Sequence, residues 1–268
     1  MRMRAPRPPR PERSAMELLE HAAAACAQDL PACLEQVAAS LAFVAALAYA
    51  LIYFERAPLA WEHAGLAGLG LALAHLWLKQ QQAAFAVRLG RRFGLEHAQP
   101  QVGGRWRNQA VWQPWSLLLL PLAAVAVLPL PHVSAFFHNL AVLDDGRSGP
   151  RQLGERAWAL SKRQVMQLQL VHGMLLILGA MVFINLLAAV FGVALLGQEL
   201  LGLQSALTRD PRAAVNSTFF LLCLGAAWAL LQPVAKAVHV LRASEAGAAA
   251  QGHDLALRLE ALQAEDPL

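Results

Sequence analysis

The residues best placed to do chemistry are polar side chains inside or beside long apolar stretches of the sequence. These side chains are histidines and asparagines: His132, His138, Asn139, Asn185 and Asn216. A polar group at membrane depth is a functional candidate because it is costly to place there. Such groups most often hydrogen-bond between helices and hold them together. The alternative is a path for a substrate or an ion along residues 132–145.

Other patterns of reactive residues are weak. No HExxH or paired CxxC motif is present, so a metal site lacks the three or four ligands that it needs. Cys26, Cys33 and Cys223 do not form the pattern of a disulfide framework. Asp144 and Asp145 could act as an acid–base pair, but Asp-Asp-Gly is also typical of a turn. The sequence therefore predicts no catalytic residue, no cofactor and no metal, and a protein that is not an enzyme.

A group of basic side chains indicates contact with lipid headgroups. Residues 150–169 are typical of an interfacial helix, in which Trp158 marks the membrane interface. The basic residues of this segment are Arg151, Arg156, Lys162 and Arg163.

The elements that position these residues are membrane helices. Of the 268 residues 57% are hydrophobic and only 15% are charged, whereas soluble domains carry about 25% charged residues. The apolar runs are continuous, so the sequence predicts an all-α, polytopic membrane helical bundle of about six spans. These spans are expected at about residues 34–54, 59–78, 111–128, 132–145, 170–196 and 213–240, within a membrane bundle of residues 34–240. The net charge of +4 is taken as orientation information and not as a sign of nucleic-acid binding.

The third and fourth spans are expected to form a hairpin that turns at Pro129 and Pro131. Proline inside a helix removes a hydrogen bond and clashes with the preceding turn. The number of arginine and lysine residues on each side of the membrane tests whether the chain turns here, because these residues are more frequent in cytoplasmic loops. Six spans place 19 of the 22 basic residues inside and 3 outside, whereas five spans place 13 inside and 9 outside. The count favours six spans with both termini in the cytoplasm.

The two ends of the chain are expected to lie on the cytoplasmic surface. Residues 1–13 combine arginine and proline and predict a disordered basic tail. Ser14 and Glu17 form a capping box that begins a surface helix over residues 14–33. A Gly/Ala linker follows Arg242, and residues 241–268 are expected to include an amphipathic C-terminal helix.

Several segments carry a family resemblance. They are HLWLKQQQAAFAVRL at 75–89, LPHVSAFFHNLAVL at 130–143, ERAWALSKRQ at 155–164, NSTFF at 216–220, QPVAKAVHVLR at 232–242 and GHDLALRLEAL at 252–262. The sequence resembles a group of uncharacterised bacterial six-span inner-membrane proteins. These are distantly similar to the membrane domain of some glycerophosphodiester phosphodiesterases. The resemblance implies six spans and no catalysis, because the active site of those phosphodiesterases belongs to a separate soluble domain.

Three functions are consistent with these patterns. The first is a non-enzymatic inner-membrane scaffold or subunit of a membrane complex, with the lipid bilayer and partner proteins as its contacts and a homo-oligomer as one form. The second is a small transporter or channel component, with His132, His138 and Asn139 lining a path along the fourth span. The third is a membrane-embedded enzyme that acts on lipid. A cavity reaching those three residues would favour transport, and a dry, closed bundle with an apolar cytoplasmic face would favour the scaffold.

Overall fold

The structure, a computed structural model, describes residues 13–95, 101–126, 130–205, 209 and 217–250. Within these residues the secondary structure is helical and contains no strand, as the sequence predicted. Four helices are long and apolar enough to cross a membrane. They are Leu30–Arg56, Val102–Ala126 (which combines two consecutive helices), Val165–Leu201 and Ser217–Ala248. The all-α prediction is therefore confirmed for the described residues, the four apolar helices are compatible with a membrane protein, and the number six remains a prediction.

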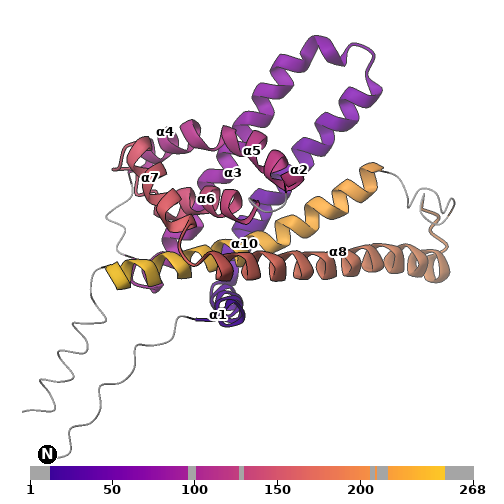
Figure 1. Ribbon diagram of the computed structural model, residues 1–268. Helices are drawn as coiled ribbons and strands as arrows, with labels where there is room; N and C mark the ends of the chain where they lie inside the picture. Colours follow the sequence, from indigo (N-terminus) through magenta and orange to yellow (C-terminus); the bar gives the residue numbers. More distant parts are fainter. Residues whose placement is uncertain (1–12, 96–100, 127–129, 206–208, 210–216, 251–268) are drawn as a thin grey trace, which may run out of the picture.

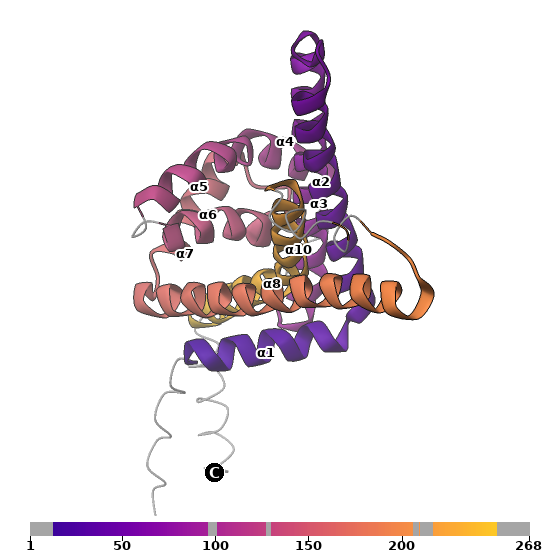
Figure 2. The same ribbon diagram turned by 90° about the vertical axis from the view of Figure 1, so that its right-hand side faces the viewer.

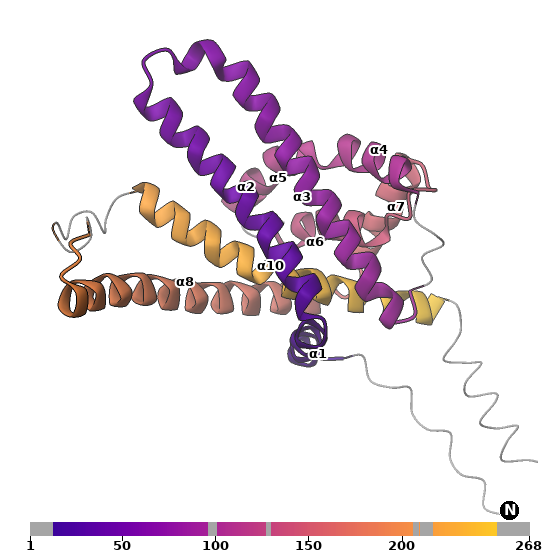
Figure 3. The ribbon, with the colours of Figure 1, turned by 180° about the vertical axis from the view of Figure 1, so that it is seen from behind.

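Two long antiparallel pairs of helices dominate the shape (Figure 1). In the first, α2 (Leu30–Arg56) is followed by the short η1 (Ala60–His63) and returns as α3 (Ala64–Arg92). The second pair is α8 (Val165–Leu201) and α10 (Ser217–Ala250). The helices α8 and α10 lie against each other near one end and diverge toward the other, which Figure 3 shows from behind.

A third, shorter pair lies beside them. The helices α4 (Val102–Trp112) and α5 (Pro114–Ala126) run in sequence, and α6 (Leu130–Leu143) returns along α5. The amide of Gln113 donates a hydrogen bond to the carbonyl of Phe137 over 3.4 Å, which ties the start of α5 to the second half of α6. The chain therefore reverses between Ala126 and Leu130, where the sequence predicted a proline turn. Figure 2 shows α5 and α6 side by side, with α7 (Pro150–Ser161) below them.

The far ends of the α2–α3 and α8–α10 pairs diverge from each other (Figures 1 and 2). In Figure 1 the ends of the α2–α3 and α8–α10 pairs point to the right, and α5 runs from α4 at the left toward α2. The segment α7 and the C-terminal end of α10 lie at the left. The C-terminal end of α3 meets that of α10 in a groove lined by Phe93, Leu95, Ala243 and Ala246.

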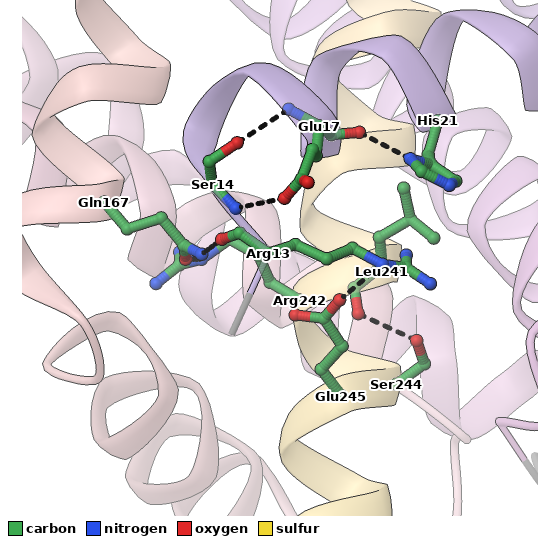
Figure 4. A network of polar contacts seen from close by, with 9 residues as sticks. All are labelled: Arg13, Ser14, Glu17, His21, Gln167, Leu241, Arg242, Ser244 and Glu245. Carbon is green, nitrogen blue, oxygen red and sulfur yellow. Dashed lines mark hydrogen bonds and ion pairs between the residues drawn. The ribbon is translucent and has the colours of Figure 1, made fainter. Parts of the chain in front are cut away.

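The helix α1 (Ala15–Gln28) lies across the end of this bundle and is fixed at its first residues (Figure 4). The predicted capping box is present, with the Ser14 amide donating to Glu17 Oε2 over 2.7 Å and the Glu17 amide donating to Ser14 Oγ over 3.2 Å. Gln167 of α8 donates to the Arg13 carbonyl over 2.7 Å, and Arg13 forms an ion pair with Glu245 of α10 over 3.3 Å. The apolar face of α1, with Leu18 fully buried, packs on α8 and α10.

Three predicted boundaries differ from the structure. The surface helix expected over 14–33 ends at Gln28, and α2 begins at Leu30 because Pro31 is accepted in the first turn of a helix. The interfacial helix expected over 150–169 ends at Ser161, since Gln164 adopts a left-handed conformation with φ of 53°. The linker expected after Arg242 is helical, because α10 continues to Ala250. Residues 1–12 and 251–268 lie outside the described residues.

Candidate ligand cavity between α6, α8 and α10

The clearest candidate site is a cavity of about 450 Å³ where α6, α8 and α10 meet. Its wall changes in chemistry from one end to the other. The polar end is formed by Ser134, His138, His172, Gln232 and His239. The remainder of the wall is apolar and includes Leu175, Leu176, Phe183, Leu224, Trp228 and Leu231. Such a wall fits a molecule with one polar end and one apolar end.

Three histidines from three helices meet at the polar end. His138 comes from α6, His172 from α8 and His239 from α10. The rings of His138 and His239 are stacked, with 4.6 Å between their centroids and 6° between their planes. The Nδ1 atoms of both rings are buried and have no hydrogen-bond partner among the described residues. The pair therefore presents unused hydrogen-bonding capacity at one end of the cavity.

A layer of buried polar side chains continues from the histidines toward α3. Gln82 of α3 donates a hydrogen bond to Gln232 of α10 over 3.1 Å. Lys236, one helical turn beyond Gln232, is 1% exposed, and Lys79 of α3 is half-buried. Lys79 lies three residues before Gln82 and therefore on the same side of α3, so both lysines lie about one helical turn from the bonded Gln82–Gln232 pair. Burying such groups without a partner is costly, so this layer is an unusual feature of the bundle.

No acid offsets these lysines in the part of the chain that the structure describes. The ion pairs there join Arg13, Arg88, Arg92 and Arg151 to carboxylates at the surface, and neither Lys79 nor Lys236 takes part in one. The charged groups that act on His138 are Lys236, Lys79 and the other two histidines, all basic. The polar end of the cavity is therefore an environment for negative charge.

The predicted intramembrane residues have different positions. His138 lines the cavity, whereas His132 and Asn139 are absent from its wall. Asn139 is fully buried and donates to the Ala157 carbonyl of α7 over 3.3 Å, which is a contact between helices. Asn185 is exposed and donates to the Met181 carbonyl of its own helix over 2.8 Å. Asn216 lies outside the described residues.

Sequence reasoning missed His172 and His239. Two other buried polar residues were also not singled out. The helix α10 continues for more than three turns beyond Lys236 and buries its side chain, and His75 is 6% exposed with its Nε2 atom 3.4 Å from Ser116 Oγ. The signal that could have been used is the spacing of Gln232 and His239, seven residues apart and so on one helix face.

A second polar cluster lies where α4 meets the turn after α6. Asp144 is fully buried, and its two carboxylate oxygens accept hydrogen bonds from Asn108, Gln109 and the Gly146 amide at 2.9, 2.7 and 3.0 Å. Burial raises the pKa of Asp144, and these hydrogen bonds oppose the shift. Asp145 has the predicted turn role, since its Oδ1 accepts from the Arg147 and Ser148 amides. Both carboxylates therefore hold the turn after α6 in place.

The four predicted headgroup residues are distributed along α7 and the turn after it. Arg151 is paired with Glu155 on the exposed surface, and Lys162 lies 4.8 Å from the centroid of the Trp158 ring. Arg156 donates to Ser148 Oγ over 3.4 Å, and Arg163 donates to the Ala246 carbonyl over 3.5 Å. Their contact with lipid remains a prediction.

Neither a metal site nor a relative assigns a function to the cavity. Among the described residues, no group of three or more His, Cys, Asp and Glu side chains is arranged to hold a metal ion. Comparison of the chain with protein-family models, with curated proteins and with solved structures finds no match.

Proposed function

We propose that this chain is a multi-pass membrane protein that binds an amphiphilic, lipid-like molecule in the cavity between α6, α8 and α10. The observation that carries the proposal is the change in the cavity wall from polar to apolar. Leu176, Leu224 and Trp228 line the apolar end and are 60%, 47% and 38% exposed. In a bilayer such exposed apolar side chains face lipid, so a chain of a lipid can enter between α8 and α10.

This proposal is a form of the transporter hypothesis and not of the scaffold hypothesis. A path for a hydrated ion needs polar groups along its length, and most of this wall is apolar. A scaffold needs no cavity of about 450 Å³ in its membrane region. The activity is proposed as non-enzymatic binding or transfer of the amphiphile, in which no bond is made or broken.

The proposed topology has four full crossings and one re-entrant hairpin. At 1.5 Å per residue, α5 with 13 residues and α6 with 14 residues are each about 20 Å long, whereas the hydrocarbon core is about 30 Å thick. The helices α2, α8 and α10 are long and apolar enough to cross, and α3 is long enough with 29 residues. We place the more polar α4 outside the hydrocarbon core, so α4 and α5 together are not counted as a crossing. A hairpin that re-enters returns to its own side, so the arginine-rich segments and both termini stay cytoplasmic as with six spans. The proposed location is the bacterial inner membrane.

The sidedness is tested with single cysteines in a chain whose three native cysteines are replaced by alanine. We expect Leu59→Cys, in the exposed α2–α3 turn, to react with a membrane-impermeant maleimide on intact cells. Arg147→Cys, in the exposed turn after α6, should react only after the membrane is permeabilised. Ready labelling of Arg147→Cys on intact cells would overturn the topology.

The binding is tested by filling the apolar end of the cavity. Ala180→Trp places a large side chain on α8 in the cavity wall, and Ala188→Trp places the same side chain on α8 outside it. In nanodiscs of phosphatidylcholine, single-chain amphiphiles should bind the wild type saturably. Ala180→Trp should weaken this binding by about tenfold or more, and Ala188→Trp should not. Absence of saturable binding, or equal binding by both variants, would refute the proposal.

A further inference from the structure

We infer that the polar end of the bound amphiphile is an anion, a carboxylate or a phosphate, that Lys236, Lys79 and the His138–His239 pair recognise. This inference rests on the proposed function, because it concerns the headgroup of the same ligand. It is carried by the position of Lys236 between two residues of α10 that line the cavity, and by a stacked histidine pair whose Nδ1 atoms have no hydrogen-bond partner among the described residues.

The first step is the position of Lys236 relative to the cavity. On α10 it lies four residues after Gln232 and three residues before His239, and both of these neighbours line the cavity wall. Residues three and four apart lie on the same side of a helix. Its side chain is 1% exposed and forms no hydrogen bond or ion pair with another described residue. The lysine is therefore adjacent to the polar end and has its donors unused.

The second step is the histidine pair. His239 is 5% exposed, it lines the cavity, and its Nδ1 atom has no partner within the described ranges. His138 is stacked on it, and its Nδ1 atom is unpartnered too. A ring nitrogen that carries a proton is a donor, and a headgroup oxygen is an acceptor. The two rings can thus donate to the same headgroup that the lysines attract.

The third step is that no acid among the described residues forms an ion pair with these lysines. A lysine that serves only structure in a dry site is expected to have an acid partner, because an unpaired buried charge is strongly destabilising. None of the ion pairs among the described residues joins Lys236, Lys79 or His239 to an acid. An anion at this position converts mutual repulsion into attraction, and its hydrocarbon tail fits the apolar wall between Leu176 and Trp228.

The experiment compares three probes that share an oleoyl chain and differ in the headgroup. Oleate carries a carboxylate, 1-oleoyl lysophosphatidate carries a phosphate, and monoolein is neutral. Binding to the full-length wild-type protein is measured in phosphatidylcholine nanodiscs. We expect at least one of the two anions to bind about tenfold or more tightly than monoolein, and the tighter anion identifies the headgroup.

The matched variants use two of the three lysines of the chain. Lys236→Met removes the buried charge and keeps the length of the side chain, and Lys162→Met removes the charge of α7 at the surface. Lys236→Met should reduce anion binding to the level of monoolein and leave monoolein binding unchanged. Lys162→Met should change neither. Thermal unfolding confirms that each variant is folded, and an apolar replacement in a dry site is expected to keep that stability.

The outcomes separate this inference from the proposed function. If the three probes bind the wild type equally, the cavity binds amphiphiles and the anionic headgroup is refuted, whatever the variants do. If Lys236→Met weakens all three probes equally while the protein stays folded, charge recognition is refuted as well. If no probe binds and Ala180→Trp changes nothing, the proposed function itself fails.

Discussion

Replacement of Asp144 by asparagine should destabilise the protein because it reverses one hydrogen bond in a fully buried cluster. Oδ1 of Asp144 accepts from Asn108 and from the Gly146 amide, and Oδ2 accepts from Gln109. Asparagine keeps one oxygen and replaces the other by an amide that donates. The new amide then faces the Gln109 amide, which is also a donor. Gln109 cannot simply rotate, because its oxygen accepts from Gln113 over 2.9 Å.

The size of the effect follows from the number of bonds lost. A hydrogen bond to a charged group contributes about 1.5–3 kcal/mol, so Asp144→Asn should lower the free energy of unfolding by about that amount. Asp144→Ala leaves the donors of Asn108, Gln109 and Gly146 without an acceptor and should cost about 3 kcal/mol or more. The contributions are not additive, since the three donors share one partner.

The measurement is equilibrium unfolding in mixed detergent and SDS micelles, followed by tryptophan fluorescence. Asp145→Asn is the matched control, because only Oδ1 of Asp145 accepts the Arg147 and Ser148 amides and asparagine retains that oxygen. It should change the free energy by less than about 1 kcal/mol. If Asp144→Asn is as stable as Asp145→Asn, the cluster does not hold α4 to α6 and the reasoning is wrong.

Three further predictions concern other parts of the bundle. The Ser14 amide donates to the Glu17 carboxylate and lowers its pKa, so the capping box should stabilise α1 above about pH 4.5 and lose this effect as the pH falls through the lowered pKa; Glu17→Gln, which keeps an acceptor but does not titrate, should flatten the dependence in unfolding measurements over about pH 3–7. Gly104→Ala should destabilise by about 1–3 kcal/mol or more, because a Cβ there overlaps the backbone of the turn after α6, whereas Gly103→Ala has open space and should be neutral or stabilising in the same assay. Burial raises the pKa of Cys26 to about 12, so iodoacetamide at neutral pH should not alkylate this thiol before the protein unfolds, as peptide mass spectrometry can determine.

The membrane-helical class could be predicted because it depends on composition and on the length of the apolar runs. The reversal between Ala126 and Leu130 could be predicted for a similar reason, since proline acts on the adjacent backbone whatever its surroundings. The break between α4 and α5 was missed, although Pro114 stands at the start of α5. Gly103 and Gly104 both lie within α4, where Gly104 allows close contact with Gly146.

The candidate site could be predicted only in part, because it is formed by tertiary packing. His138 was recognised as a polar residue in an apolar segment, but its neighbours His172 and His239 come from helices that no local pattern pairs with α6. The last span was expected to end at residue 240, which would leave Lys236 near water. Four residues would then separate it from the end of the helix, whereas α10 reaches Ala250.

The length of α8 has a consequence for the membrane around the protein. With 37 residues this helix is about 55 Å long, well beyond the thickness of any hydrocarbon core that it could cross upright. It must tilt steeply or deform the adjacent lipid. A thinner bilayer requires a steeper tilt or a larger deformation. Ring contacts between α8 and α10 extend to Phe191, so the last ten residues of α8 are the part that responds to such hydrophobic mismatch.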